Sequence, residues 1–251
     1  MKRTLIVIAT ALFLLIAGFF LWPLPSALQA GEEKNLRILD RSGLLLYEVE
    51  SEESAGTLKR SDIPDHFIQA LIATEDRDFL SHMGLSPRGI LRAAWENMKA
   101  GKVVQGGSTI TQQFVRQQIK PAKRNFSWKI REALLALKTD MRLSKEEILL
   151  GYLSGTFFGN RAYGLTAAAK TYFNKSVSEL SLAESAYLVG LLKAPSTLNP
   201  FKDPTAAKAR QELVLQTLRE QALLTQEELV EWKKESITLA SGKVKIEAPH
   251  F

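Results

Sequence analysis

The stretch FIQALIATEDRDFLSHMG, residues 67–84, joins an apolar run directly to a dense group of charged and polar side chains. Its first half places Phe67, Ile68, Leu71 and Ile72 three or four residues apart, which is the spacing of one helix face. Its second half supplies three acids, an arginine and a histidine. Charges gather in this way at a solvated helix end and also at the rim of a catalytic cleft, and the stretch by itself favours the solvated end.

Helix signals dominate the chain around and after this stretch. Pro64 begins the helix of the opening stretch with Asp62 nearby as a cap, and Ser86 with Pro87 begins another that ends at Gly101. Ser127 is expected to cap a third helix. Three further starts have the capping-box pattern: Ser144 with Glu147, Ser181 with Glu184, and Thr225 with Glu228. The sequence therefore predicts a mainly α fold.

Two of the predicted helices carry regular apolar faces. One face consists of Ile90, Leu91, Ala94 and Met98, and the other consists of Ile130, Leu134, Leu137 and Met141. Before the helical region, the β-rich runs of Leu36–Val49 flank a turn sequence and predict a short hairpin.

The N-terminus predicts a membrane anchor. Thr4–Trp22 contains 19 residues without a charge, enough for a helix to cross roughly 30 Å of hydrocarbon. The basic residues before it favour a cytoplasmic N-terminus and export of the rest. A cleaved signal peptide with a processing site at Leu28–Ala30 is the alternative, although the apolar run is longer than such peptides usually have.

Composition narrows the remaining choices. The 251 residues are 45% hydrophobic and suit one domain with an appendage. The absence of cysteine excludes disulfides and thiol chemistry. A net charge of +6 favours an anionic partner, which by charge alone is nucleic acid, a lipid headgroup or a phosphorylated substrate.

Three local groupings are candidates for chemistry. Glu75 ends an apolar helix, where burial and repulsion from Asp76 would raise its pKa as a general base requires. Gly106–Gln113, GGSTITQQ, offers Ser108 as an N-cap and a helix start able to bind an anion. The plainer interpretation of Glu75 is a solvated helix end, and that of Gly106–Gln113 is an ordinary loop-to-helix start.

The other local features are equally ambiguous. The polar face formed by Thr109, Gln112, Gln113 and Arg116 follows the same loop. The third grouping, Lys129 with Glu132, is either a surface ion pair or a carboxylate that supports a metal or cations near a leaving group. A lone His82 is more often a packing residue than an acid or base.

Five ordered stretches together resemble a known family. EDRDFLSHMG, GGSTITQQ, WKIREALLALK, KEEILLGYLSGTFFGNRAYGLTAAAKTYF and ELSLAESAYLVGLLKAPSTLNP are similar to the successive motifs of glycosyltransferase family 51, the peptidoglycan glycosyltransferases. The resemblance runs from about Ile63 to Gln226. It implies a lysozyme-like, mainly α domain that polymerises lipid II and releases undecaprenyl pyrophosphate.

The resemblance also implies roles for residues. Glu75 matches the glutamate that takes the proton from the acceptor 4-hydroxyl during a single inverting displacement, which turns an α-linked pyrophosphate into a β-1,4 bond. Glu132 matches the second glutamate, which organises the pyrophosphate side directly or through a divalent cation such as Mg²⁺. The expected cations near the donor or pyrophosphate are Arg116, Arg124, Lys129 and Lys193. The positions expected to shape the cleft are Asp76, Phe79, His82, Ser108, Thr109 and Gln113.

The chain departs from the family pattern in places. Trp128 stands where the third motif usually has an arginine, which removes a cation from the pyrophosphate side. Ser154 and Gln117 replace frequent asparagines. The glycine-bearing joint Lys99–Gly107 falls where the family has a mobile segment over the cleft, so high mobility is expected there.

The expected organisation has four parts: an anchor at 1–25, a tether and hairpin at 26–60, the glycosyltransferase domain at 61–235, and a tail at 236–251. The tail resembles the junction to the transpeptidase domain of class A penicillin-binding proteins, so the chain is a fragment of such an enzyme or a monofunctional transferase. The expected location is the cytoplasmic membrane with the catalytic domain on the extracytoplasmic, periplasmic face. The expected partners are lipid II, the growing glycan chain and other cell-wall synthesis proteins, with no nucleic acid.

Two alternatives stay open. A lytic glycan hydrolase on the same scaffold would also use paired carboxylates, although the cations and the anchor argue against it. A non-catalytic, membrane-anchored module that binds lipid II or a partner protein is the second.

Overall fold

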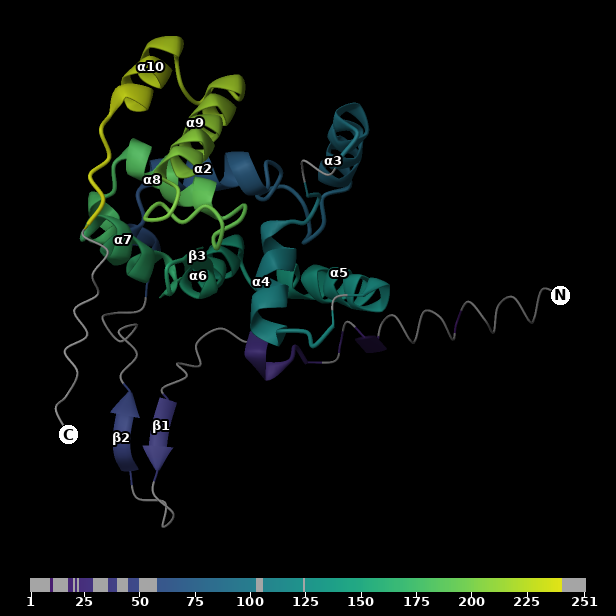
Figure 1. Ribbon diagram of the computed structural model, residues 1–251. Coiled ribbons are helices and arrows are strands. Elements are labelled where there is room, and N and C mark those ends of the chain that lie inside the picture. Colours follow the sequence, from purple (N-terminus) through teal and green to yellow (C-terminus); the bar gives the residue numbers. More distant parts are fainter. Residues whose placement is uncertain are drawn as a thin grey trace.

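The computed structural model describes residues 10, 18–19, 21, 23–28, 36–39, 45–49, 58–102, 106–123 and 125–240. Within these ranges the chain is mainly helical, which confirms the predicted fold class (Figure 1). The helices are α2 (Asp65–Glu75), α3 (Pro87–Ala100), α4 (Ile110–Ile119), α5 (Phe126–Asp140), α6 (Lys145–Gly155), α7 (Leu165–Phe173), α8 (Leu182–Leu191), α9 (Pro204–Glu220) and α10 (Gln226–Lys234). Short 3₁₀ turns lie at η1 (Ser26–Leu28), η3 (Arg60–Asp62) and η4 (Val177–Glu179).

Two small antiparallel sheets accompany the helices. β1 (Leu36–Leu39) pairs with β2 (Leu45–Val49), with Ile38 opposite Tyr47, and this pair is the predicted hairpin. The hairpin projects away from the helices (Figure 1). β3 (Phe157–Gly159) pairs with β4 (Ala162–Tyr163) beside α7.

The core is built around α8. Every residue of LAESAYLVGL in this helix is buried, as expected for a helix that is apolar nearly all round and lies inside a domain. α2 and α9 both pack on α8 (Figure 1), and Phe67, Ala70 and Leu71 of α2 are buried. The C-terminal end of α2, which carries Glu75, is therefore anchored to the most deeply buried helix.

A second packed group contains α4, α5 and α6. Ile110, Phe114 and Val115 of α4 are buried in it, and Tyr152 of α6 is almost fully buried. The cleft described below lies between this group and the helices around α8, because its lining residues come from both.

The apolar faces predicted for α3 and α5 point outward. Ile90, Leu91 and Met98 are 50%, 71% and 65% exposed, and α3 stands apart from the other helices (Figure 1). On α5, Ile130, Leu134 and Met141 are also exposed, whereas the buried face includes Trp128, Glu132 and Leu135. Both faces follow the expected period, but they do not build the core.

The helix starts largely follow the predicted caps. Ser86, Ser144, Ser181 and Thr225 each accept a hydrogen bond from a first-turn amide. The cap predictions for α2, α5 and α4 were wrong, and the last of these, Ser108, is described with the site. Asp62 accepts from the Lys59 amide in η3 instead of capping α2, and Asn125, not Ser127, caps α5 by accepting from the Trp128 amide at 2.9 Å. On α5 the neighbouring Asn125 side chain takes the cap position, whereas Pro64 stands at the N-cap of α2 and no side chain caps that helix.

Several expectations concern residues outside the described ranges. The described part of the chain contains no helix long and apolar enough to cross a membrane, and most of the expected anchor at Thr4–Trp22 lies outside it. Residues 103–105 of the expected mobile joint and residues 241–251 of the tail also lie outside it.

Gly84, in the loop after α2, lies against the backbone of α5. Its replacement tests this packing. Its φ is +76° and a Cβ there would overlap the carbonyl of Ala136 in α5, whereas Gly101 has φ +62° and open space around it. Gly84→Ala should therefore lower the free energy of unfolding by about 3 kcal/mol, from positive φ plus overpacking. Gly101→Ala should cost about 1 kcal/mol from φ alone. Urea unfolding measures both, and equal losses would contradict the packing of Gly84 on α5.

Candidate active site

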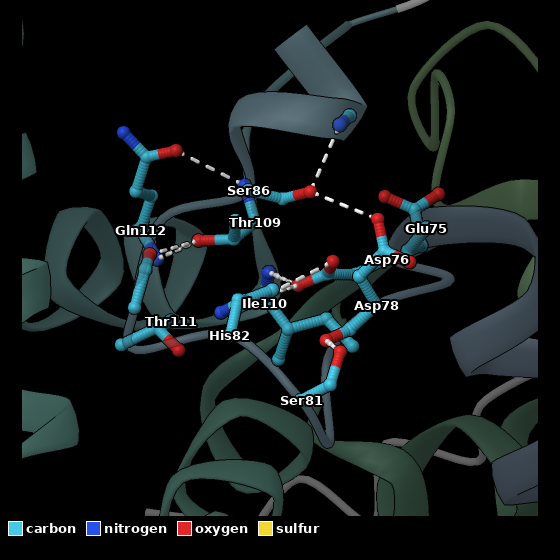
Figure 2. A network of polar contacts seen from close by, with 12 residues as sticks. Glu75, Asp76, Asp78, Ser81, His82, Ser86, Thr109, Ile110, Thr111 and Gln112 are labelled. Carbon is cyan, nitrogen blue, oxygen red and sulfur yellow. Dashed lines mark hydrogen bonds and ion pairs between the residues drawn. The ribbon is translucent and has the colours of Figure 1, made fainter. Parts of the chain in front are cut away.

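Asp76, the residue after α2, joins the end of α2 to the start of α4. Its Oδ2 accepts hydrogen bonds from the Ile110 amide at 2.9 Å and from His82 Nε2 at 2.9 Å (Figure 2). The Asp76 side chain is only 4% exposed and that of His82 only 6%. A carboxylate is stabilised at the positive end of a helix dipole. The Asp76 cluster, comprising Asp76, His82 and Ile110, thus fills the helix start that the sequence left open to an external anion.

The N-cap of α4 is Thr109, so the prediction of Ser108 as the cap was wrong. Thr109 Oγ1 accepts from the Gln112 amide and Gln112 Oε1 accepts from the Thr109 amide, which together form a capping box. The Thr109 hydroxyl also donates to the Gly84 carbonyl at 2.6 Å. Ser108 is thereby left outside the helix, where its Oγ accepts from Lys129 Nζ at 3.0 Å.

Further contacts hold the loop between α2 and α3. Asp78 accepts from the Ser86 hydroxyl at 3.0 Å (Figure 2). Lys145 Nζ donates to the His82 carbonyl at 2.6 Å and lies 4.9 Å from the centre of the Phe79 ring. Phe79 itself is fully buried. His82 is therefore held at its ring by Asp76 and at its backbone by Lys145.

Glu75 lines a cleft of about 560 Å³. Its Oε2 accepts from Gln113 Nε2 at 2.9 Å, and its side chain points away from the Asp76 carboxylate (Figure 2). Gln113 Oε1 in turn accepts from the Tyr152 hydroxyl at 3.3 Å. Burial, with a smaller contribution from the Glu75 charge, raises the pKa of Tyr152, so this residue stays a protonated donor. The Tyr152 hydrogen bond fixes which end of the Gln113 amide faces Glu75.

Glu132 of α5 is the centre of a second group of contacts. Lys129 Nζ lies 2.5 Å from Oε1, and Arg116 Nη1 lies 3.8 Å from Oε2. Trp128 Nε1 donates to Oε2 at 3.2 Å. We call these four residues the Glu132 cluster. Because Glu132 is only 1% exposed, the interpretation of Lys129 and Glu132 as a mere surface pair was wrong.

α4 relates the two glutamates to each other. Gln113 contacts Glu75 and Arg116 contacts Glu132, and these two α4 residues are three positions apart. Residues with this spacing lie on one helix face and roughly 4.5 Å apart along the axis. Glu75 and Glu132 therefore lie along the same face of α4, one beside a neutral amide and the other beside two cations.

The structure distributes the predicted site residues between the cleft and its supports. Glu75, Ser108, Gln113, Arg116 and Lys193 line the cleft. Asp76, Phe79 and Thr109 are buried and are not among its lining residues, and Arg124 lies outside the described residues. In the part of the chain that is described, no three His, Cys, Asp or Glu residues are grouped to hold a metal ion.

Among the cleft residues that sequence reasoning missed are two arginines, Arg77 and Arg210. Arg77 was interpreted as a helix-end charge, and it is indeed exposed, but it also lines the cleft. On α9, burial lowers the pKa of Arg210 while the charge of Glu75 raises it. The signal available in the sequence was weak: Arg210, Leu213, Val214 and Thr217 share a helix face, and nothing local relates that face to Glu75.

Removal of the Asp76 carboxylate tests the Asp76 cluster. Asp76→Ala should lower the free energy of unfolding by about 3 kcal/mol, because it leaves His82 and the Ile110 amide without their buried partner. The exposed Asp65→Ala should cost less than about 1 kcal/mol. Urea unfolding gives both values, and hydrogen exchange should show lost protection of the Ile110 amide. A loss below about 1 kcal/mol with Ile110 still protected would show that Asp76 does not hold α4.

Comparisons with known proteins agree with the motifs. Residues 42–219 match the transglycosylase family. Penicillin-binding protein 1A of Aquifex aeolicus is 45% identical over 177 residues, which cover 70% of this chain and 24% of that protein. The corresponding protein of Haemophilus influenzae is 39% identical over 234 residues, covering 93% and 27%. Its crystal structure aligns with a TM-score of 0.47 at 27% identity, over 84% of this chain and 22% of that one.

The chain spans about a quarter of the length of these relatives. The family match includes Glu75, Glu132 and the whole of the intervening α4. The resemblance identified from the motifs is thereby confirmed, and the chain belongs to the transglycosylase family.

Proposed function

We propose that this chain polymerises lipid II into β-1,4 glycan strands and releases undecaprenyl pyrophosphate, on a lysozyme-like scaffold. The observation that carries the proposal is the unequal environment of the two glutamates along α4. Glu75 lines the cleft beside the neutral amide of Gln113, whereas Glu132 lies between Lys129 and Arg116. One carboxylate is suited to accept a proton, and the other is suited to hold cations in place.

Glu75 acts as the general base in this proposal. The acceptor 4-hydroxyl is a weak nucleophile, and loss of its proton to Glu75 as the oxygen attacks the donor anomeric carbon assists the new bond. The bond from that carbon to the pyrophosphate oxygen breaks at the same time, and its electron pair leaves with the pyrophosphate. A single displacement of this kind inverts the α-linked donor to a β-linked product.

The Glu132 cluster serves the leaving group. Lys129 and Arg116 each carry one positive charge and Glu132 one negative charge, so the three charged groups keep a net charge of +1. Fixed cations stabilise the negative charge that develops on the departing pyrophosphate. Arg116 and Lys193 line the cleft directly, which makes them the two expected contacts to that group.

A divalent cation, Mg²⁺, is part of the proposal, and Glu132 is the residue that would hold it together with the substrate pyrophosphate. Mg²⁺ often binds through one or two carboxylates and substrate phosphates rather than an all-protein cage, which fits a site with a single central carboxylate. Each carboxylate oxygen can accept more than one partner, so the contacts from Lys129 and Trp128 leave Glu132 able to take part. The bound cation would supply charge neutralisation at the pyrophosphate.

The proposed location is the cytoplasmic membrane, with the catalytic domain on its extracytoplasmic face. It is supported by the apolar run at Thr4–Trp22 and by the outward apolar faces of α3 and α5, since large exposed apolar patches mark interaction sites. A lipid-linked substrate is confined to the same surface. Other cell-wall synthesis proteins are the proposed partners at this surface.

Purified lipid II provides the direct test of the reaction. The wild type should form glycan polymer and undecaprenyl pyrophosphate, and Glu75→Gln should lower kcat at least about 100-fold because the base is lost. Glu212→Gln, a matched change at an α9 carboxylate that pairs with Lys233, should retain the wild-type rate. Shortening of preformed glycan without polymer formation would instead support a lytic hydrolase, and lipid II binding with no turnover would support a non-catalytic module.

Chelation tests the cation. EDTA should lower the polymerisation rate at least about tenfold, because charge on the pyrophosphate is then no longer neutralised. Added Mg²⁺ should restore the rate. In Glu132→Gln, more Mg²⁺ should be needed for half of the maximal rate than in the wild type. An undiminished rate in EDTA would contradict the proposed cation.

A further inference from the structure

We propose that Trp128 is a positioning residue that holds the Glu132 carboxylate and thereby keeps Arg116 available to the substrate. This inference rests on the proposed glycosyl transfer and assigns a role to a residue that replaces a cation in the family pattern. Trp128 is 9% exposed, and its indole Nε1 donates to Glu132 Oε2 at 3.2 Å. Its contribution is therefore a hydrogen bond and not a charge.

The local structure places the indole where this bond can form. Asn125 caps α5 and fixes the helix start by accepting from the Trp128 amide at 2.9 Å. Trp128 and Glu132 are then four residues apart, and side chains with that spacing lie over one another on a helix face. Lys129, three residues before Glu132, approaches the other oxygen at 2.5 Å. The carboxylate is thus held from one oxygen by a cation and from the other by a neutral donor.

The hydrogen bond from Trp128 to Glu132 affects Arg116. Its Nη1 lies 3.8 Å from Glu132 Oε2, which is longer than a hydrogen bond, while Arg116 also lines the cleft. Oε2 has a hydrogen bond from the indole, and Arg116 lies near the charge of Glu132 without a hydrogen bond to it. An unsatisfied buried carboxylate oxygen would draw the guanidinium inward, since buried charges require partners.

Because the indole of Trp128 is neutral, it adds nothing to the net charge of the Glu132 cluster. With tryptophan at position 128 the Glu132 cluster has two cations and one carboxylate. An indole N–H can only donate and carries no charge, so it orients the carboxylate without competing for the pyrophosphate. The two tasks of an arginine at this position, orienting a carboxylate and binding a phosphate, are here divided between Trp128 and Arg116.

Steady-state kinetics on lipid II with the full chain test this role. Trp128→Phe keeps an aromatic ring and removes the N–H, and it should lower kcat about tenfold with less than a twofold change in KM, because the lost interaction acts on the leaving group. In an Arg116→Gln background the same substitution should change kcat less than about twofold, since its effect passes through Arg116. Trp232→Phe on α10 is the matched control and should keep the wild-type kcat. An unchanged kcat in Trp128→Phe, or an equal tenfold loss in the Arg116→Gln background, would overturn the proposal.

A spectroscopic measurement does not depend on the folding of the Trp128 variant. The sequence contains four tryptophans, so ¹⁵N-indole labelling gives at most four N–H signals, which Trp22→Phe, Trp95→Phe and Trp232→Phe assign by elimination. Glu132→Gln should shift the Trp128 signal and leave the Trp232 signal in place. An unmoved Trp128 signal would overturn the proposal. If the wild type itself forms no polymer, the proposed function fails, whereas a fully active Trp128→Phe beside an active wild type refutes only the role of Trp128.

Discussion

The hydrogen bond from the Ile110 amide to the Asp76 carboxylate is the contact on which the rest of the site depends. It fastens the start of α4 to the residue that follows Glu75, and it does so with a buried charge placed at a helix N-terminus, where the helix dipole favours it. His82 and the Thr109 capping box stabilise the same junction. Because this junction is fixed, the orientation of α4 relative to the end of α2 is fixed as well. The positions of the α4 side chains that line the cleft follow from it.

The positions of Gln113 and Arg116 on α4 separate the two glutamates and the different roles proposed for them. Gln113 reaches Glu75, and Arg116, three residues further on, reaches toward Glu132. The neutral amide beside Glu75 leaves the carboxylate without a bonded cation from α4, as suits a proton acceptor. Lys129 and Arg116 lie instead at the buried Glu132 carboxylate, where the departing pyrophosphate of the proposed reaction would need them. A rigid helix can maintain this division more reliably than a loop.

Local signals predicted most of the helices and most of the caps, because each cap depends on a few adjacent residues. Ser86, Ser144, Ser181 and Thr225 are examples in which the sequence was sufficient. The errors arose where neighbours compete, as Thr109 does with Ser108 and Asn125 with Ser127. Periodicity identified apolar faces on α3 and α5 but could not tell what they would contact, and both face outward.

The site itself was accessible from the sequence only through the family resemblance. Charge and spacing alone favoured a solvated helix end for Glu75 and left Glu132 open between a surface pair and a functional carboxylate, because burial depends on elements far along the chain. Asp76 pairs with an amide 34 residues away, and Arg210 reaches the cleft from α9. No local pattern carries such contacts.

The orientation of substrate along α4 is the central claim, and a structure of the protein bound to a non-reactive lipid II analogue and an acceptor tests it most directly. The acceptor 4-hydroxyl is expected within about 3 Å of a Glu75 oxygen, and the pyrophosphate is expected in contact with Arg116 and Lys193. A complex with the pyrophosphate beside Glu75, or with the acceptor hydroxyl nearer to Glu132, would contradict it.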